Sequence, residues 1–470
     1  MRKNASEKNL LSGSLAKSVL MFAMPLAFTG ILQQLFNAAD IAVVGQFTGE
    51  LGAHCMAAVG ACGSLISLLV NLFIGISLGS NVVIANFVGA RDEKGTSQAV
   101  KTSIIISVIG GFLVMIPGLL SAGMLLNMMS VPAEVFDLAL TYLQIYLLGL
   151  PIILLYNFEA AIFRGIGNTK LPLAALSFAG VINVILNIIL VVFFDMNVAG
   201  VAIATVASNA VSSLILLYFL YKKTNLMSPE YGSFRIYPKL LSRILKIGIP
   251  SGIQSSVFSI ANVVIQSGFN SLGTIVMAAS SAALNLELTT FNLVSAFGQT
   301  CTTFTGQAYG AGEIEKCPKI LKTCMLEGLG AVFVTAMIII SFGKPILSIF
   351  NSNPEVIEYG YLRLSILVCC HLFSVIYETI SGYLRGFGIS LLPAVLTTFG
   401  VCVLRVFWMM FIFPASPTYL TILMVFPISL GSAALLLCMA LFIKRPASRL
   451  QKSRQEKDSV SEGRTCIQPC

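Results

Sequence analysis

The sequence predicts an all-α polytopic membrane protein, with twelve transmembrane helices arranged as two pseudo-symmetric six-helix lobes. Three observations carry this prediction: a very apolar composition, a series of long apolar runs, and an internal repeat with a constant offset. Of the residues, 56% are hydrophobic and 10% are charged, and the mean hydropathy is +0.89. Soluble globular domains carry about 25% charged residues. The chain is therefore expected to lie in a lipid bilayer.

Twelve apolar runs are long enough to cross a bilayer, which takes about 20 residues. Single Gly or Pro residues interrupt several of them, as transmembrane helices tolerate. Several runs exceed the minimum length, which indicates tilted helices or ends that project beyond the hydrocarbon. The predicted spans are 15–46, 53–87, 98–126, 134–163, 171–194, 198–222, 241–270, 277–309, 318–350, 355–385, 391–413 and 418–443.

The connections between these spans alternate in charge. Of the 29 Lys and Arg residues, 26 fall on one side, and the exceptions are Lys344, Arg363 and Arg405. Cytoplasmic loops carry such an excess of cations, so this side and both termini are expected to be cytoplasmic, with the chain in the plasma membrane. The basic residues thus set topology, and no nucleic-acid partner is expected.

Other function classes find no support in the residues. The eleven cysteines have neither metal-ligand spacing nor the setting of a disulfide framework, and we interpret them as small apolar fillers. Residues 1–14 lack the apolar core and cleavage site of a signal peptide. Because no nucleophile–base set, phosphate loop or metal cluster appears, we expect neither an enzyme nor ATP-driven transport.

The second half of the chain repeats landmarks of the first half at an offset of 221 residues. Because six helices separate the copies, both halves have the same orientation, which is a parallel repeat. The offset at Pro25 and Pro250 is 225, so the first helix carries about four extra residues. The matched landmarks are Leu51-Gly52 with Leu272-Gly273, Gly89-Ala90 with Gly310-Ala311, Phe163–Gly167 with Leu384–Gly388, and Pro172 with Pro393.

The repeat divides the chain into two lobes and three polar segments. Two such lobes create a central cleft, and rocking of one lobe against the other gives alternating access. The architecture therefore favours a transporter. The predicted parts are a cytoplasmic tail over 1–14, an amino-terminal lobe over 15–222, a cytoplasmic linker over 223–240, a carboxy-terminal lobe over 241–445, and a basic cytoplasmic tail over 446–470.

The first span contains one carboxylate, Asp40. Gln33 and Asn37 precede it at spacings of four and three, so all three lie on one helical stripe. An aspartate at the centre of a transmembrane helix costs roughly 2.5–3.5 kcal/mol on insertion scales, so it normally faces a bundle interior or a watery cavity. Asp40 is a candidate coupling group of an ion-driven transporter. The alternative is a structural carboxylate capped by neighbouring hydroxyls.

Several motifs together resemble the multidrug and toxic compound extrusion (MATE) family of transporters, over about residues 15–445. The first span has the family's spacing of Pro25, Asp40 and Gly45, and the 6+6 repeat fits the family architecture. The other motifs are the Gly89–Lys94 loop, with sequence GARDEK, and the R-G-x-G segments at Arg164–Gly167 and Arg385–Gly388. The resemblance implies export of cationic or amphipathic compounds against inward H⁺ or Na⁺. Lipid-linked sugar flippases, which belong to the same wider group, are the competing assignment.

In one branch of the family the coupling ion binds in the amino-terminal lobe. The resemblance places that ion-coupling site at Asp40, Asn157, Asn183, Asn187 and Thr205. The position of Asn187 is often an aspartate in the family, and one carboxylate fewer weakens Na⁺ binding. A proton on Asp40 is therefore the simpler coupling ion.

The other branch of the family uses acidic residues in helices 7 and 10, which this chain does not match. Helix 7 has no acidic residue, and Glu378 in helix 10 is not at the usual aspartate position. Glu287 and Arg405 lie deeper in their spans and form either a buried structural pair or part of a second site. Glu287, Glu378 and Arg405 are accordingly a possible polar site of the carboxy-terminal lobe.

Polar residues of the first and seventh spans are candidates for the substrate cavity. Such residues also hold membrane helices together by hydrogen bonds, which is the alternative. The candidates are Gln33, Asn37, Gln254, Asn262 and Gln266.

The sequence thus predicts a secondary active antiporter for multidrug efflux. It is expected to need no cofactor and no metal beyond Na⁺ as a possible coupling ion, and to act as a monomer on small cationic or amphipathic molecules. A flippase for a lipid-linked precursor is the alternative, although only Arg363 and Arg405 are available to hold a pyrophosphate. A membrane enzyme or sensor is a third class, against which stands the lack of a catalytic set.

Overall fold

The computed structural model describes residues 13–129, 131–224, 226–348 and 353–451. These residues form helices joined by short turns, and none of them lies in a strand. Residues 349–350, at the end of the predicted span 318–350, and most of both predicted tails lie outside the described ranges.

The helices follow the predicted spans closely. In the first half they are α1 (Leu15–Phe47), α2 (Gly52–Gly89), α3 (Glu93–Met128), α4 (Ala133–Ile166), α5 (Lys170–Ile188) and α6 (Asn197–Lys223). In the second half they are α7 (Pro238–Ser271), α8 (Thr274–Gly310), α9 (Cys317–Ser348), α10 (Pro354–Gly386), α11 (Leu391–Thr397), α12 (Leu404–Phe407) and α13 (Tyr419–Lys444). The predicted twelve-helix all-α membrane fold is confirmed.

Two of the twelve transmembrane helices contain π-helical turns. The turn Ile189–Phe193 extends α5 to the predicted length of its span. The turns Thr398–Val403 and Trp408–Ile412 flank α12, so that α11 and α12 are parts of one transmembrane helix over Leu391–Ala415.

Eleven helical segments of the described chain are long and apolar enough to cross a membrane, and α8 is not among them. At 37 residues α8 has the length of a span, but its sequence is rich in Ser, Thr, Asn and Gln. It packs against α10, α9, α1 and α2, so most of its polar residues lie among other helices, whereas Ser281 and Asn285 are exposed.

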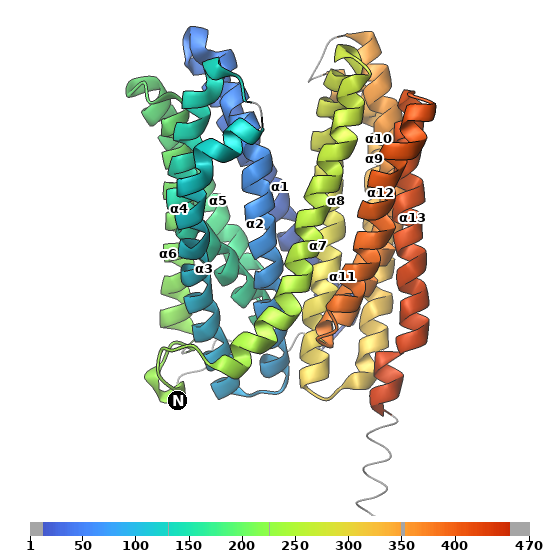
Figure 1. Ribbon diagram of the computed structural model, residues 1–470. Coiled ribbons are helices and arrows are strands. Elements are labelled where there is room, and N and C mark those ends of the chain that lie inside the picture. The colour runs from blue at the N-terminus through green and yellow to red at the C-terminus, as the bar shows by residue number, and fades with distance from the viewer. Residues whose placement is uncertain (1–12, 130, 225, 349–352, 452–470) are drawn as a thin grey trace, which may run out of the picture.

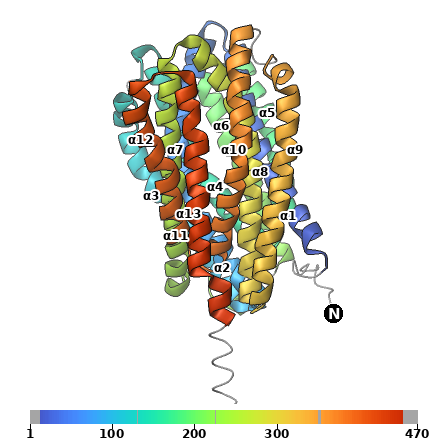
Figure 2. The same ribbon diagram turned by 90° about the vertical axis from the view of Figure 1, so that its right-hand side faces the viewer.

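The helices form two groups that correspond to the two halves of the sequence. Figure 1 shows α1–α6 on the left and α8–α13 on the right, with α7 crossing diagonally from beneath the first group. The ribbons of the two groups lie closer together at the lower end than at the upper end. Figure 2 shows that α1 begins and α13 ends at this same lower end, as an even number of spans requires.

The lower ends of α2 and α8 cross with reciprocal contacts between the two lobes. A Cβ atom added at Gly89 would overlap the backbone carbonyl of Gln307, and one added at Gly310 would overlap that of Asn86. Each pair is the image of the other at the repeat offset of 221. The pseudo-twofold relation between the lobes therefore passes through this crossing, where only glycine lets the backbones approach.

Small residues also bring α2 close to α7. Gly75 packs on the backbone of Gly252, and Gly79 on the backbone of Ile244. Such small-residue contacts are the usual way for membrane helices to pack closely. Thr303 Oγ1 on α8 also donates to Asn81 Oδ1 on α2 over 3.2 Å. The lobes are thus joined along the half of α2 that leads to the basic loop.

The connection between the lobes is fastened to the amino-terminal lobe. Lys101 on α3 is only 1% exposed, and its Nζ donates to the carbonyls of Ser228 and Gly232, each over 2.7 Å. The Tyr231 hydroxyl donates to Glu93 Oε2 over 2.5 Å, and the Ser97 hydroxyl donates to the Leu226 carbonyl. Residues 226–233 of this connection are therefore bound to α3 before α7 begins, and we call them the strap.

Candidate functional site

Asp40 lies in α1 with its carboxylate turned into the amino-terminal lobe. It is 6% exposed. Asn187 Nδ2 on α5 donates to Asp40 Oδ1 over 2.5 Å, and Thr205 Oγ1 on α6 lies 3.0 Å from Asp40 Oδ2. Three helices therefore meet at one carboxylate, and each of its oxygens has a neutral donor.

Asn183 completes this cluster from one turn earlier on α5. Asn187 Nδ2 also donates to Asn183 Oδ1, over 3.3 Å, and both asparagines are buried. Asn187 Oδ1 is buried as well and makes no hydrogen bond to any other described residue. The cluster thus holds an amide oxygen that is free to accept a bond from a proton donor or to contact a cation.

The helices around Asp40 have two local features that position these side chains. The regular α-helical part of α5 ends at Ile188, directly after Asn187, and a π-helical turn follows. Such turns occur frequently at functional sites. Thr205 Oγ1 also lies 2.9 Å from the Val201 carbonyl, so its single proton serves either that carbonyl or Asp40. The threonine can therefore change partner when the charge on Asp40 changes.

The electrostatics of the cluster are those of an uncompensated carboxylate. None of the ion pairs found among the described residues involves Asp40. A buried charge normally has a partner of opposite sign. Asp40 is instead surrounded by amides and a hydroxyl, an arrangement that can accept a proton or a monovalent cation. Across those same residues, no group of three or more His, Cys, Asp or Glu side chains is placed to hold a metal ion.

Asn157, the remaining member of the predicted ion-coupling set, does not bond to Asp40. It lies half-buried on α4, and its Nδ2 donates to the Ile153 carbonyl of its own helix over 2.8 Å. The structure therefore brings together Asp40, Asn183, Asn187 and Thr205, and leaves Asn157 outside their hydrogen-bond network.

The polar stripe on α1 changes its surroundings along the helix. Gln33 and Asn37 are exposed, whereas Asp40 is buried. The two amides therefore stand on the accessible part of the same stripe whose buried end is the carboxylate.

Two of the three predicted polar residues of α7 bond to arginines of the carboxy-terminal lobe. Gln254 accepts a bond from Arg385 Nη2 and Asn262 accepts one from Arg405 Nη1, each over 2.9 Å. Gln266 Nε2 donates to Asn270 one turn later over 3.0 Å. Gln254 is buried, but Asn262 is exposed.

The acidic residues of the carboxy-terminal lobe have different partners from those expected. Glu287 pairs with Arg363 over 2.7 Å, so the predicted Glu287–Arg405 pair is wrong in its second member. The position of Arg363 in the sequence gives no indication that it faces α8. The sequence carries no signal that selects between two buried arginines.

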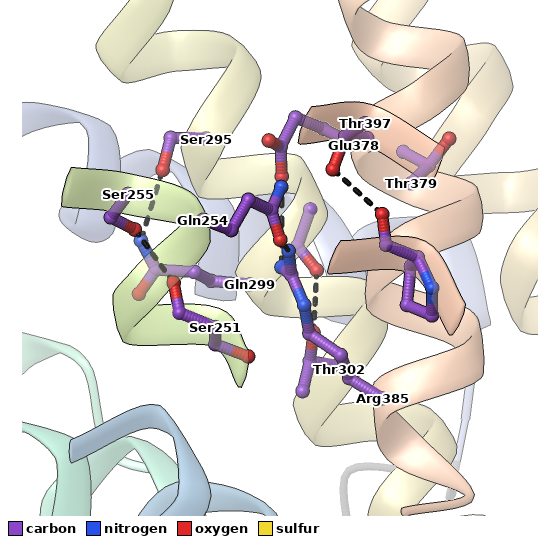
Figure 3. A network of polar contacts seen from close by, with 12 residues as sticks. Ser251, Gln254, Ser255, Ser295, Gln299, Thr302, Glu378, Thr379, Arg385 and Thr397 are labelled. Carbon is purple, nitrogen blue, oxygen red and sulfur yellow. Dashed lines mark hydrogen bonds and ion pairs between the residues drawn. The ribbon is translucent and has the colours of Figure 1, made fainter. Parts of the chain in front are cut away.

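Glu378 belongs to a separate network in the same lobe. Figure 3 shows Glu378, Arg385 and Gln254 in a row, with Arg385 Nη1 3.8 Å from Glu378 Oε2. The three residues predicted as one polar site, Glu287, Glu378 and Arg405, therefore make their closest polar contacts with three different partners.

The fold and the cluster define a class of protein. Two repeated six-helix lobes that meet at one end, with an uncompensated carboxylate buried inside one of them, are the architecture of a membrane transporter. The sequence profile of the MatE family matches residues 25–189 and 250–410, one segment in each lobe. The chain belongs to this family, the MATE family of multidrug efflux transporters.

Relatives with known names match the sequence of this chain over most of their length. The probable multidrug resistance protein NorM of Thermotoga maritima is 26% identical over 399 residues, covering 83% of this chain and 84% of its own. The multidrug export protein MepA of Staphylococcus saprophyticus is 22% identical over 376 residues, covering 80% and 82%.

Solved structures share the fold. A multidrug resistance MATE family transporter of the MOP superfamily, in an outward-facing conformation, has a TM-score of 0.87 at 24% identity and covers 96% of this chain and 100% of its own. A MATE crystal structure in a bent conformation has a TM-score of 0.81 at 23% identity, covering 96% and 99%.

Proposed function

We propose that the protein is a secondary active antiporter that exports cationic or amphipathic small molecules in exchange for inward H⁺ or Na⁺. The observation that carries this proposal is the buried Asp40 carboxylate, held by Asn187 and Thr205 without a cationic partner. A transporter that couples to an ion needs such a group, whose charge changes when the ion binds. The names of the relatives NorM and MepA support multidrug cargo.

The hydrogen bonds around Asp40 suggest how the coupling works. In the charged form, Asp40 accepts bonds from both Asn187 and Thr205, and it attracts a cation. A proton on one carboxylate oxygen removes the charge, and Thr205 can then donate to the Val201 carbonyl instead. Binding of the ion therefore changes both the charge of the site and the bonds between α1 and α6.

The contacts between the lobes suggest which side is closed. They are concentrated where α2 and α8 end, next to the loops with the most Lys and Arg. We place these loops and both termini in the cytoplasm by the positive-inside rule, and the protein in the plasma membrane as a monomer. In this conformation the transporter is closed toward the cytoplasm and open toward the outside. Gln33 and Asn37, which are exposed in this conformation, are therefore accessible in the outward-open state.

A flippase for a lipid-linked precursor is less well supported. Such a protein needs cations to hold a pyrophosphate, and one of the two available arginines, Arg363, is already paired with Glu287.

Dye efflux from proteoliposomes tests the proposal. The purified protein is reconstituted with a cationic dye, and a pH gradient or a Na⁺ gradient is imposed separately. Dye flux that follows one of the gradients and stops when that gradient is collapsed is the expected result. Dye flux of equal rate without any gradient would contradict an antiport mechanism.

A further inference from the structure

A groove with a volume of about 850 Å³ lies between the beginning of α7 and the beginning of α11. Figure 1 shows these two segments side by side near the lower end of the molecule. The Ser390 hydroxyl donates to the Lys246 carbonyl over 3.1 Å and so joins them. The residues that line the groove belong neither to the cluster around Asp40 nor to the ion pairs of the carboxy-terminal lobe. The groove is therefore separate from the sites described above.

The lining of the groove is amphipathic. Ser242 and Lys246 lie one turn apart on α7, and both side chains are exposed. Most of the other lining residues are apolar, and among them Ile249 and Leu391 are exposed. The groove thus combines a cation and a hydroxyl group with an apolar surface, which are the two kinds of contact that a phospholipid needs.

The apolar surface continues along both helices. Ile253 follows Ile249 and Val395 follows Leu391 at a spacing of four residues, so each pair lies on one helical face. All four side chains are exposed. Both helices run from the lower end of the molecule toward the upper end (Figure 1), and both belong to membrane spans. The two pairs therefore extend the groove along the spans, where an acyl chain can contact them.

The helices on both sides of the groove contain no acidic residue. Neither α7 nor the segment Leu391–Lys444 has an Asp or Glu, whereas the beginning of α7 has Lys239, Arg243 and Lys246. Among the described residues, no carboxylate lies within 4.0 Å of Lys246 Nζ. An unpaired cation at the boundary of a membrane attracts an anionic headgroup and repels a cationic molecule.

We propose that this groove binds one phospholipid with an anionic headgroup. The headgroup phosphate accepts bonds from the Lys246 ammonium and the Ser242 hydroxyl, and an acyl chain lies along Ile249 and Leu391. Basic pockets between transmembrane helices on the cytoplasmic side bind lipid headgroups in this way. The site goes beyond the proposed antiport function, and only the assignment of the lipid to the cytoplasmic leaflet rests on the orientation proposed above.

Native mass spectrometry of the detergent-solubilised full chain tests the proposal. The chain is titrated with phosphatidylglycerol, which is anionic, or with phosphatidylcholine, which is zwitterionic, and both lipids have the same acyl chains. We expect the first phosphatidylglycerol to bind about fivefold more tightly than the first phosphatidylcholine, which corresponds to about 1 kcal/mol for one cation near the headgroup. No ion gradient is present in this measurement, so a failure of lipid binding is distinguishable from a failure of antiport.

A matched pair of variants makes the test specific to the groove. Lys246→Gln removes the cation at an exposed position, and the preference for phosphatidylglycerol is expected to disappear. Lys322→Gln removes an exposed cation from α9, which does not line the groove, and should leave the preference unchanged.

Two further measurements locate the lipid and identify its source. With a photoreactive phosphatidylglycerol that carries a diazirine in its acyl chain, we expect label on peptides that contain residues 249–253 or 391–395. Glycerol phosphate, which is the headgroup without acyl chains, should not displace the lipid at equal concentration.

Each of four results would overturn the proposal. The first two are equal binding of both lipids by the wild type and an unchanged preference in Lys246→Gln. The third is label that is absent from both groups of peptides. The fourth is displacement by glycerol phosphate at equal concentration, which would indicate a site for free phosphate.

Discussion

Asn187 donates its side-chain amide to Asp40 Oδ1 over 2.5 Å and so joins α5 to α1 inside the amino-terminal lobe. The same nitrogen reaches Asn183 Oδ1 over 3.3 Å. Asn187 is therefore the central member of the cluster around the carboxylate. Its identity as an amide, rather than an acid, determines the total charge of the site.

Replacing Asn187 by Asp tests how this charge selects the ion. The variant places a second carboxylate beside Asp40, and Na⁺ is held by several oxygen ligands of which charged ones bind best. We expect dye efflux from proteoliposomes to gain dependence on the Na⁺ gradient, with a stimulation of roughly tenfold, equivalent to about 1.4 kcal/mol of binding. An Asn187→Asp variant that responds to Na⁺ no more than the wild type would contradict this role.

Asn157 and Asn183 should differ in their effect on transport. Asn157 bonds only to its own helix at Ile153, whereas Asn183 accepts a bond from Asn187. We expect Asn183→Ala to slow ion-driven efflux several-fold, since one hydrogen bond contributes about 0.5–1.5 kcal/mol. Asn157→Ala should have a clearly smaller effect. Equal losses in the two variants would contradict a hydrogen-bond network around Asp40 that includes Asn183 but not Asn157.

Substitutions at the crossing of α2 and α8 are expected to favour the conformation in which the lower ends of the lobes are apart. Gly89→Val and Gly310→Val would each press a side chain into a backbone carbonyl of the other lobe. We expect the lower ends of the lobes to separate. Spin labels on the exposed residues 94 and 315, in a chain without its native cysteines, would then report longer distances by pulsed electron paramagnetic resonance.

The control for this experiment is Gly330→Val on α9. A Cβ atom there meets no atom within 4 Å, so the label distances should stay as in the wild type. Unchanged distances in both interface variants would contradict the importance of the crossing.

The strap between the lobes depends on one buried lysine. Lys101→Met keeps the length of the side chain but removes the donor to the Ser228 and Gly232 carbonyls. Leaving a buried acceptor without its donor costs about 1–3 kcal/mol, so we expect faster limited proteolysis within residues 226–233. Lys94→Met, at an exposed position on the same helix, should leave the proteolysis rate unchanged.

Most of the fold is predictable because the bilayer imposes it. Length and apolarity predict all twelve spans, and the constant repeat offset supplies the arrangement of the lobes. The helix α8 is less apolar than the other eleven, and most of its hydroxyl and amide side chains lie against neighbouring helices. The π-helical turn after Asn187 has no marker in the sequence, since the apolar run continues through Ile189–Phe193.

The candidate site was predictable only in part. The spacing of Asn183 and Asn187 on one face, together with the family resemblance, led to the cluster at Asp40. The partners of Glu287 were not predictable, because composition shows that a buried acid needs a cation but not which helix provides it. Packing of α8 on α10 places Arg363 there and leaves Arg405 among neutral side chains.

The most direct test of the account is ion-driven efflux by the Asp40→Asn variant. Asn fits the space of Asp40 but cannot change its charge, so it keeps the size of the side chain and loses the coupling group. Asp195→Asn, at an exposed turn, controls for loss of an acid elsewhere. In proteoliposomes with an imposed pH or Na⁺ gradient, we predict that Asp40→Asn abolishes gradient-driven dye efflux and Asp195→Asn does not. Efflux by Asp40→Asn at the wild-type rate would contradict the account.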